Sequence, residues 1–273
     1  MSYLNRDAAG FGRDLWAAID ETAVATAREV LTGRRFLEVD GPYGAALTSV
    51  ELGEDGYCRD PGPDEAGAVV GRAVSVPMIR KGCQLSIRRI EASRAIGQPL
   101  NLSAVADAAE AVARREEAFI YYGQADFGLE GLLTAEGRHQ QPGGDWGKTE
   151  QALEEVLAAV NRLDGSGFHG PYALAVSPAL YNALFRRYEG TDMLQLEHLR
   201  RLCESGVFKA PIEGGVVVDP HVGRLLVGQD LAAGYIGQDG IHHDLYLSES
   251  LVLLVEEPAA ICTLGGGAPR KKK

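Results

Sequence analysis

Apolar residues recur at helical spacing near the start of the chain, across residues 14–31. The stripe consists of Leu15, Ile19, Ala23, Ala27 and Leu31. Gly33 follows it and is typical of a helix stop. Trp16 lies beside the stripe, where a large aromatic side chain is more often a core anchor than a cofactor platform. The pattern predicts an amphipathic helix that packs one face on the rest of the protein.

A second helical pattern spans residues 101–122 and is the longest in the chain. Its apolar face consists of Leu102, Val105, Ala109, Val112 and Phe119. Asn101 or Ser103 is available as the N-terminal cap. Glu116 falls on the apolar face, where a carboxylate is stable only with a partner. We therefore expect Glu116 to pair with an arginine from another element.

Between these two helices, residues 45–52 and 68–79 have strand-like composition. Residues 53–67, rich in glycine, proline and acidic side chains, separate them and indicate a solvated tip. The segment predicts a long hairpin. Two strands alone are only marginally stable, so we expect the hairpin to lie on another surface.

The second half of the chain mixes helices and strands. It predicts a helix over residues 149–163, a strand over 172–176, a helix capped by Ser177 with Pro178 in its first turn, and a helix over 192–202. Short apolar runs between glycine and aspartate breaks predict strands at residues 216–218, 225–227, 245–247 and 251–255. Regular alternation of strand and helix is missing, which favours an α+β fold over a doubly wound sheet.

The net charge of −11 argues against a protein that holds a nucleic-acid backbone, because such binding needs clustered cations. The one basic run, residues 270–273, follows several glycines at the C-terminus and is expected to be a solvated, flexible tail. The four cysteines form no CxxC pair, which fits neither a zinc site nor a disulfide framework. With no apolar leader or membrane-length segment, the sequence predicts a cytoplasmic protein.

Motifs for catalysis or metal binding are weak. Gly165, Gly167 and Gly170 fit a GxGxxG pattern, but a helix precedes them and a strand follows, which is the reverse of the order that dinucleotide binding needs. Asp219 and His221 have no third metal ligand nearby in the sequence. The chain contains neither a GxSxG elbow nor a Walker loop. We predict no catalytic residue, metal site or cofactor, and hence no enzyme activity.

Several longer motifs occur in order along the chain. They are GRRFLEVDGPYG from Gly33, EAFIYYG from Glu117, GLEGLLT from Gly128, HGPYALAVS from His169 and GQDLAAGY from Gly228. Together they resemble the encapsulin shell family, also called linocin-type bacteriocin proteins, over nearly the full length. The resemblance implies a Hong-Kong-97-type phage major capsid fold with a peripheral domain, an axial domain and an extended loop.

On that resemblance the chain divides into six segments. They are residues 1–45 (N-terminal helix and first part of the peripheral domain), 46–78 (extended loop), 79–128 (peripheral domain with the spine helix), 129–223 (axial domain), 224–264 (peripheral-domain strands) and 265–273 (flexible tail). In this fold the extended loop lies on a neighbouring subunit. The first lysine, Lys81, comes after the loop, so contacts there are expected to be non-covalent rather than lysine crosslinks.

The resemblance implies a self-assembling icosahedral compartment that encloses a cargo enzyme, either a ferritin-like iron storage protein or a dye-decolourising peroxidase. A targeting peptide at the C-terminus of the cargo docks on the inner wall, between the N-terminal helix region and the later strands. By motif position this role falls to Arg34, Glu38, Asp230 and Leu231. The residues alone leave open that Arg34 and Glu38 pair across a strand or cap the first helix.

Two other functions share this family or fold: a phage-type major capsid protein, and a linocin-type bacteriocin or protease. A protease needs a nucleophile and a base, and no such pair is evident. Some family members carry a flavin stacked on a tryptophan, but the matching position here is Ile90, so no flavin is predicted. The identity of the cargo and the size of the shell are left open.

Overall fold

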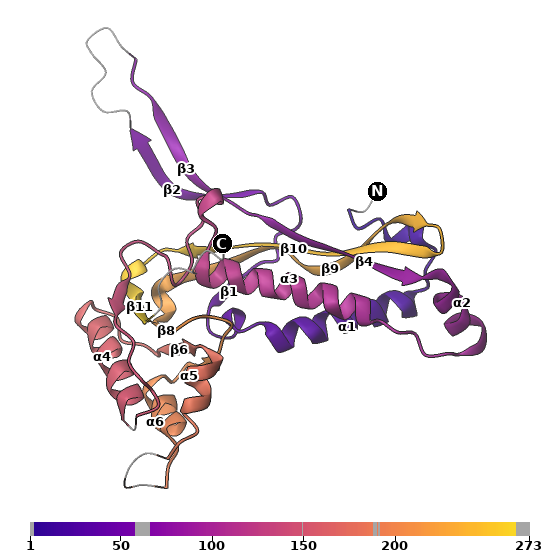
Figure 1. The fold of residues 1–273 in the computed structure, drawn as a ribbon. Helices are drawn as coiled ribbons and strands as arrows, with labels where there is room; N and C mark the ends of the chain where they lie inside the picture. Colours follow the sequence, from indigo (N-terminus) through magenta and orange to yellow (C-terminus); the bar gives the residue numbers. More distant parts are fainter. Residues whose placement is uncertain (1–2, 58–65, 149, 188–189, 191, 266–273) are drawn as a thin grey trace, which may run out of the picture.

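A long antiparallel strand pair runs through one of the two main sheets, which has fewer but longer strands than the other and is called the larger sheet below. The four strands of this sheet, in spatial order, are β1 (Glu38–Asp40), β9 (Gly223–Asp239), β10 (His242–Val255) and β4 (Met78–Ser86). Helices α1 (Arg13–Val30) and α3 (Ser103–Tyr122) lie along one face of it (Figure 1). The computed structural model describes residues 3–57, 66–148, 150–187, 190 and 192–265.

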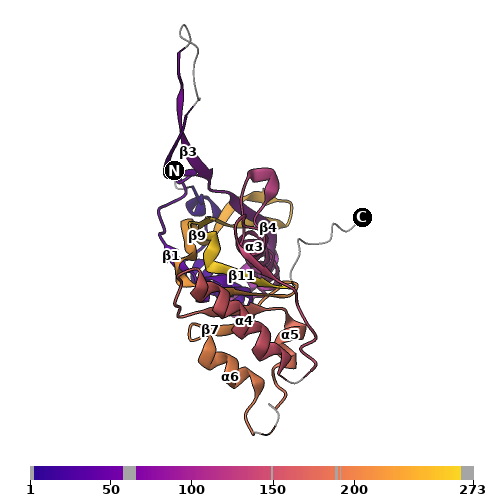
Figure 2. The same ribbon diagram turned by 90° about the vertical axis from the view of Figure 1, so that its left-hand side faces the viewer.

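The smaller lobe contains a five-stranded sheet. Its strands, in spatial order, are β5 (His139–Gln141), β11 (Ile261–Leu264), β8 (Gly215–Val218), β6 (Ala173–Val176) and β7 (Gly206–Lys209). Its helices are α4 (Gln151–Gly165), α5 (Pro178–Ala183) and α6 (Gln195–Leu202). Figure 2 shows this lobe on the side of the body opposite the projecting hairpin.

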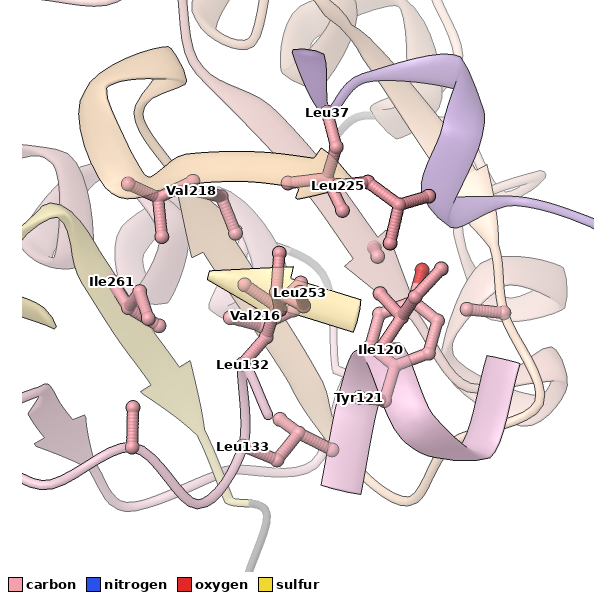
Figure 3. Packing of buried hydrophobic residues seen from close by; sticks show 14 of the residues in the cluster. Leu37, Ile120, Tyr121, Leu132, Leu133, Val216, Val218, Leu225, Leu253 and Ile261 are labelled. Carbon is pink, nitrogen blue, oxygen red and sulfur yellow. The ribbon is translucent and has the colours of Figure 1, made fainter. Parts of the chain in front are cut away.

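One apolar core joins the two sheets. Leu225 and Leu253 of the larger sheet pack with Val216, Val218 and Ile261 of the smaller one (Figure 3). The end of α3 and the segment after it add Ile120, Tyr121, Leu132 and Leu133. The lobes are therefore packed together, and burial of this apolar surface opposes their separation.

The predicted hairpin is present as β2 (Ser49–Tyr57) and β3 (Val69–Ser75), and it projects from the body (Figures 1 and 2). Its tip lies largely outside the described residues. Both predicted strands are wrong in their extent: the first, residues 45–52, is β2, which runs on to Tyr57 into the predicted tip, and the second, residues 68–79, is divided between β3 and β4. Pro77 lies between β3 and β4, because proline lacks the N–H that a continuous strand needs.

Most of the helix predictions are confirmed, including those for α1, α3, α4 and α5. Ser177 Oγ accepts a hydrogen bond from Leu180 N at 3.3 Å, as its predicted capping role requires. The cap position of α3 is Leu102, which has no side-chain cap bond, so neither Asn101 nor Ser103 is the cap; Asn101 Oδ1 accepts a hydrogen bond from Ser103 N at 2.8 Å from one position earlier. Helix α6 begins three residues later than predicted, at Gln195. Helix α2 (Ile87–Ile96) was not predicted.

The strands predicted at residues 225–227, 245–247 and 251–255 are present but longer than predicted. The structure has two long strands there, β9 and β10. Glycines that suggest breaks lie inside β9, where they allow close packing. A Cβ atom on Gly234 would lie 2.3 Å from the ring of Tyr246.

The division into peripheral and axial domains remains a prediction, and residues 261–264 are assigned to the peripheral strands in it. In the structure these residues are β11, which pairs with β5 and β8 of the five-stranded sheet. Within the described part of the chain, every helix is too short or too polar to span a bilayer.

Candidate functional site

A groove of about 470 Å³ lies between α1 and β9. Its lining residues are Val24, Ala27, Arg28, Leu31, Arg34, Arg35, Asp230 and Leu231. Those from α1 are spaced three or four apart, so they form one stripe on the helix. Three of the four residues predicted for peptide docking, Arg34, Asp230 and Leu231, meet here.

A second hollow, of about 540 Å³, lies beside the start of α1. Its lining residues are Arg6, Asp7, Phe11, Arg13, Trp16, Ala17 and Asp20. Arg6 pairs with Asp20 at 2.6 Å, and its guanidinium carbon lies 4.7 Å from the Trp16 ring centroid. Trp16 is buried in the core, as predicted. The two hollows follow the same side of α1, because their helix residues belong to one helical stripe.

A β-bulge brings Asp230 and Leu231 to the groove. Ser248 pairs with Ala232 and Ser250 pairs with Gln229, so two residues of β9 lie opposite the single residue Glu249. Such a bulge bends the strand and redirects its side chains. Gln229 N donates to Ser250 Oγ at 2.9 Å, which fixes one end of the bulge.

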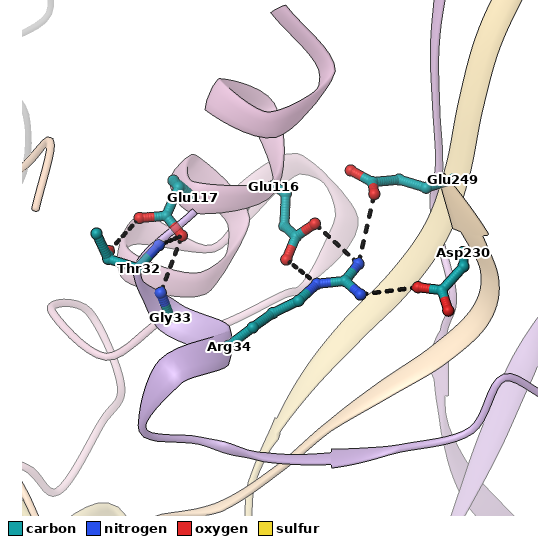
Figure 4. A network of polar contacts seen from close by, with 7 residues as sticks. All are labelled: Thr32, Gly33, Arg34, Glu116, Glu117, Asp230 and Glu249. Atoms are coloured by element: carbon teal, nitrogen blue, oxygen red, sulfur yellow. Dashed lines mark hydrogen bonds and ion pairs between the residues drawn. The ribbon is translucent and has the colours of Figure 1, made fainter. Parts of the chain in front are cut away.

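Arg34 connects four elements at the edge of the groove (Figure 4). It lies in the short 3-10 helix η2 (Gly33–Arg35) and makes a bidentate pair with Glu116 of α3, at 2.6 and 3.0 Å. Its remaining contacts are to Asp230 Oδ1 at 2.8 Å and to Glu249 Oε2 at 3.4 Å. Glu116 is fully buried, and the prediction that it pairs with an arginine is confirmed.

Electrostatics keep the Arg34 guanidinium charged. Burial alone would lower the Arg34 pKa, but the hydrogen bonds and charges of Glu116, Asp230 and Glu249 raise it above its ordinary value. Glu249 is in the opposite situation. Burial raises the pKa of its carboxyl well above the ordinary value, the charge of Glu116 raises it further, and Arg34 only partly offsets this.

A second buried carboxylate, Glu117, holds the turn after α1 (Figure 4). It accepts hydrogen bonds from the backbone N–H of Thr32 at 2.9 Å and of Gly33 at 3.0 Å, and from the Thr32 hydroxyl. Gly33 packs so closely on α3 that an added Cβ would lie 2.7 Å from Ile120. The turn that carries Arg34 is therefore held on α3 by the hydrogen bonds of Glu117 and by the close packing of Gly33.

Replacing Glu117 with alanine is expected to lower the unfolding temperature of the protein. The change leaves the buried N–H groups of Thr32 and Gly33 without acceptors, at a cost of about 1 to 3 kcal/mol each. Thermal unfolding would measure it, with Glu110→Ala on the exposed face of α3 as the matched control. Equal midpoints for the two variants would contradict the assigned role of Glu117.

Glu38, the fourth predicted docking residue, is exposed in β1 and does not line the groove. It lies opposite Arg224 of β9 in the strand register. The alternative pairing of Arg34 with Glu38 is not what the structure shows, since Arg34 has its partners on α3, β9 and β10.

Sequence reasoning missed Val24, Leu31 and Glu249 at this site. Val24 and Leu31 lie seven positions apart on one helix face, a signal that was available. Glu249 is a carboxylate in the middle of a strand whose neighbouring residues are mostly apolar, which also marks a site.

Elsewhere, the weak motifs have structural roles. Asp219 accepts hydrogen bonds from His221 N at 2.9 Å and from Gly170 N at 2.8 Å, and so joins two loops. Burial raises the Asp219 pKa, but these hydrogen bonds outweigh that effect and lower it overall. Among the described residues no three potential ligands gather around a possible metal position. Ile90, at the position compared with the flavin tryptophan, is buried in the core.

Comparisons with known proteins agree with the fold and the motifs. The family model Linocin_M18, described as "Encapsulating protein for peroxidase", matches residues 1–252. The chain is 37% identical to the type 1 encapsulin shell protein EncA of Myxococcus xanthus, with 94% of each chain covered. It is 32% identical to a diheme-cytochrome-encapsulin shell fusion protein of Kuenenia stuttgartiensis, covering 91% of this chain and 72% of that protein.

Solved structures show the same architecture. A virus-like particle from Pyrococcus furiosus gives a TM-score of 0.73 at 20% identity, covering 92% of this chain and 99% of that one. The capsid of Myoviridae phage XM1 gives 0.59 at 17% identity, covering 86% and 90%. The predicted α+β capsid fold of the Hong-Kong-97 type is therefore confirmed.

Proposed function

Because the chain belongs to the encapsulin family of shell proteins, we propose that the capsid-like compartment it forms encloses a cargo enzyme held by a C-terminal targeting peptide. Shell formation itself follows from the family, and the chain is a structural protein rather than an enzyme. We further propose that the shell is icosahedral, that it lies in the cytoplasm and that it holds a cargo enzyme. The cargo is a dye-decolourising peroxidase or a ferritin-like iron storage protein, and the family description favours the peroxidase.

The groove beside α1 is the observation that carries this proposal. Val24, Leu31 and Leu231 provide apolar contacts, while Arg28 and Asp230 place opposite charges at its edges. A peptide docks on such a surface by burying apolar side chains, and the charges set its register. Glu38 lies in β1, outside the groove, so it would contact only a part of the peptide that extends beyond the groove.

The two hollows together set the length of the peptide. They follow α1 from Arg13 to Leu31. Eighteen helical steps correspond to about 27 Å. An extended peptide of about eight residues has this length.

A peptide library tests the proposal directly. Fusions of a small fluorescent protein to random C-terminal peptides of about eight residues would be co-expressed with the shell protein. The fusions that remain in purified shells would then be sequenced. A recurring peptide sequence is expected, whereas retention independent of the peptide would contradict the proposal.

Val24→Asp is expected to reduce retention of the selected fusion by about tenfold or more, since an unpaired charge against an apolar contact costs at least about 1.4 kcal/mol. Val24 is partly exposed, so the substitution leaves the core intact. Leu157→Asp, at an exposed position on α4, is the matched control. Fluorescence per shell measures the effect, and equal loading in the two variants would exclude the α1 groove as the docking site.

A further inference from the structure

Three carboxylates share one guanidinium beside the groove. Glu116 and Glu249 are 0% and 2% exposed, while the Asp230 side chain is 58% exposed. Arg34 gives two hydrogen bonds to Glu116 but only a 3.4 Å contact to Glu249. The second oxygen of Glu249, Oε1, is buried and has no hydrogen-bond partner among the described residues.

Among the residues that the structure describes, Arg34 is the one cation that acts on Glu249. The charged groups that face it are Glu116 from α3, Arg34 from η2 and Asp230 from β9. From β4 its neighbour in the register is the apolar residue Ile79. If all three carboxylates were ionised, the cluster of three carboxylates and one arginine would have a net charge of −2. Two of the carboxylates, Glu116 and Glu249, would be ionised while buried. Buried like charges of this kind retain a proton.

Glu249 also lies opposite the bulge that brings Asp230 and Leu231 to the groove. A change in the charge of Glu249 would therefore affect Asp230 and Leu231, which line the groove. An ionised Glu249 attracts Arg34 more strongly than the neutral acid does. The contact that Arg34 would give up most readily is the exposed one, with Asp230.

We infer that Glu249 is a positioning residue of the groove that acts as a neutral carboxylic acid, keeping Asp230 on Arg34, and that its ionisation frees Asp230 and weakens peptide docking as the pH rises. This inference rests on the proposed cargo groove. If docking requires the protonated acid, affinity falls about tenfold per pH unit once the pH exceeds the Glu249 pKa.

The same proton affects stability in a defined direction. The folded protein binds this proton more tightly than the unfolded chain does, because the folded-state pKa is raised. The stabilisation is therefore fully present below the ordinary glutamate pKa, and it is lost as the pH rises through the folded-state value. Glu249→Gln keeps the shape and hydrogen-bonding capacity of the neutral acid, so it is expected to remove this pH dependence.

The test compares wild-type and Glu249→Gln shells, loaded with the selected fusion or empty, from about pH 6 to about pH 9. Hydrogen exchange of residues 226–234 is measured at each pH, and the ratio of protection in loaded and empty shells reports docking. Intrinsic exchange cancels in that ratio. Thermal unfolding of the empty shells gives a second measurement that does not depend on cargo. Glu110→Gln, exposed on α3, is the control.

The expected result is a protection ratio that falls with pH in the wild type and in Glu110→Gln but stays level in Glu249→Gln. The unfolding midpoint of the wild type should fall with pH more steeply than that of Glu249→Gln. Equal pH dependence in all three proteins would overturn the inference while leaving the groove in place. Failure to select any peptide would instead contradict the proposed function, and the docking part of the inference with it.

Discussion

Arg34→Ala subunits are expected to be destabilised by about 3 to 5 kcal/mol, because removing one partner of a buried ion pair leaves an uncompensated charge. Glu116 is fully buried and receives both of its ion-pair hydrogen bonds from Arg34. The same side chain ties the turn after α1 to β9 and β10. Loss of these contacts should loosen the turn after α1 from β9 and β10, so the yield of closed shells should fall sharply.

Thermal unfolding and the yield of closed shells would measure this effect. Arg114→Ala is the matched control, since Arg114 is 64% exposed and pairs with Glu110 on the surface of α3, where an ion pair contributes about 0.5 kcal/mol or less. Combining Arg34→Met with Glu116→Leu and Glu249→Leu replaces the buried charges with apolar side chains, and it is expected to restore much of the stability. A single Arg34→Ala variant as stable as the control would contradict the assigned role of Arg34.

Shortening the hairpin is expected to abolish closed shells while leaving the subunit folded. Leu52, Val69 and Val70 are 40%, 61% and 67% exposed, and a pair of strands with such residues gains stability by covering them. Glu51 and Ala73 are opposite each other in the register, so an Asn-Gly turn can replace residues 52–72. The hairpin base, where Val50 and Val74 pack on the body, is retained.

Size-exclusion chromatography and thermal unfolding separate the two expected effects. The shortened variant should elute as monomers or small oligomers, yet unfold near the wild-type temperature, because the described residues among those excised lie outside the buried core. Val69→Thr with Val70→Thr keeps the hairpin and should weaken assembly only in part. Closed particles formed by the shortened variant would contradict an assembly role for the hairpin.

Periodicity and pairing rules predicted the parts of the fold that are determined locally. Helices α1 and α3 each have a clear apolar stripe, and Glu116 on the stripe of α3 correctly indicated a buried pair. Helix α2 was not predicted because it buries only Ile90 and has almost no apolar face. The full length of β9 and β10 was not predicted because glycines were interpreted as strand ends. Some of them instead allow close packing inside a strand, as Gly234 does against Tyr246.

The candidate site depended on long-range geometry. Motif similarity identified Arg34, Asp230 and Leu231, although it could not show that a bulge opposite Glu249 brings the last two to α1. Glu38 belongs to the same motif as Arg34 but lies in β1, away from the groove. Which residues of a motif reach a common surface depends on strand register and on bulges, and motif similarity alone gives neither.

Cryo-electron microscopy of shells loaded with the selected fusion tests the central claim most directly. The account predicts a closed shell in which the groove between α1 and β9 faces the interior, with peptide density along Val24, Leu31 and Leu231. A closed shell in which that groove faces outward, or is filled by a neighbouring subunit, would contradict it.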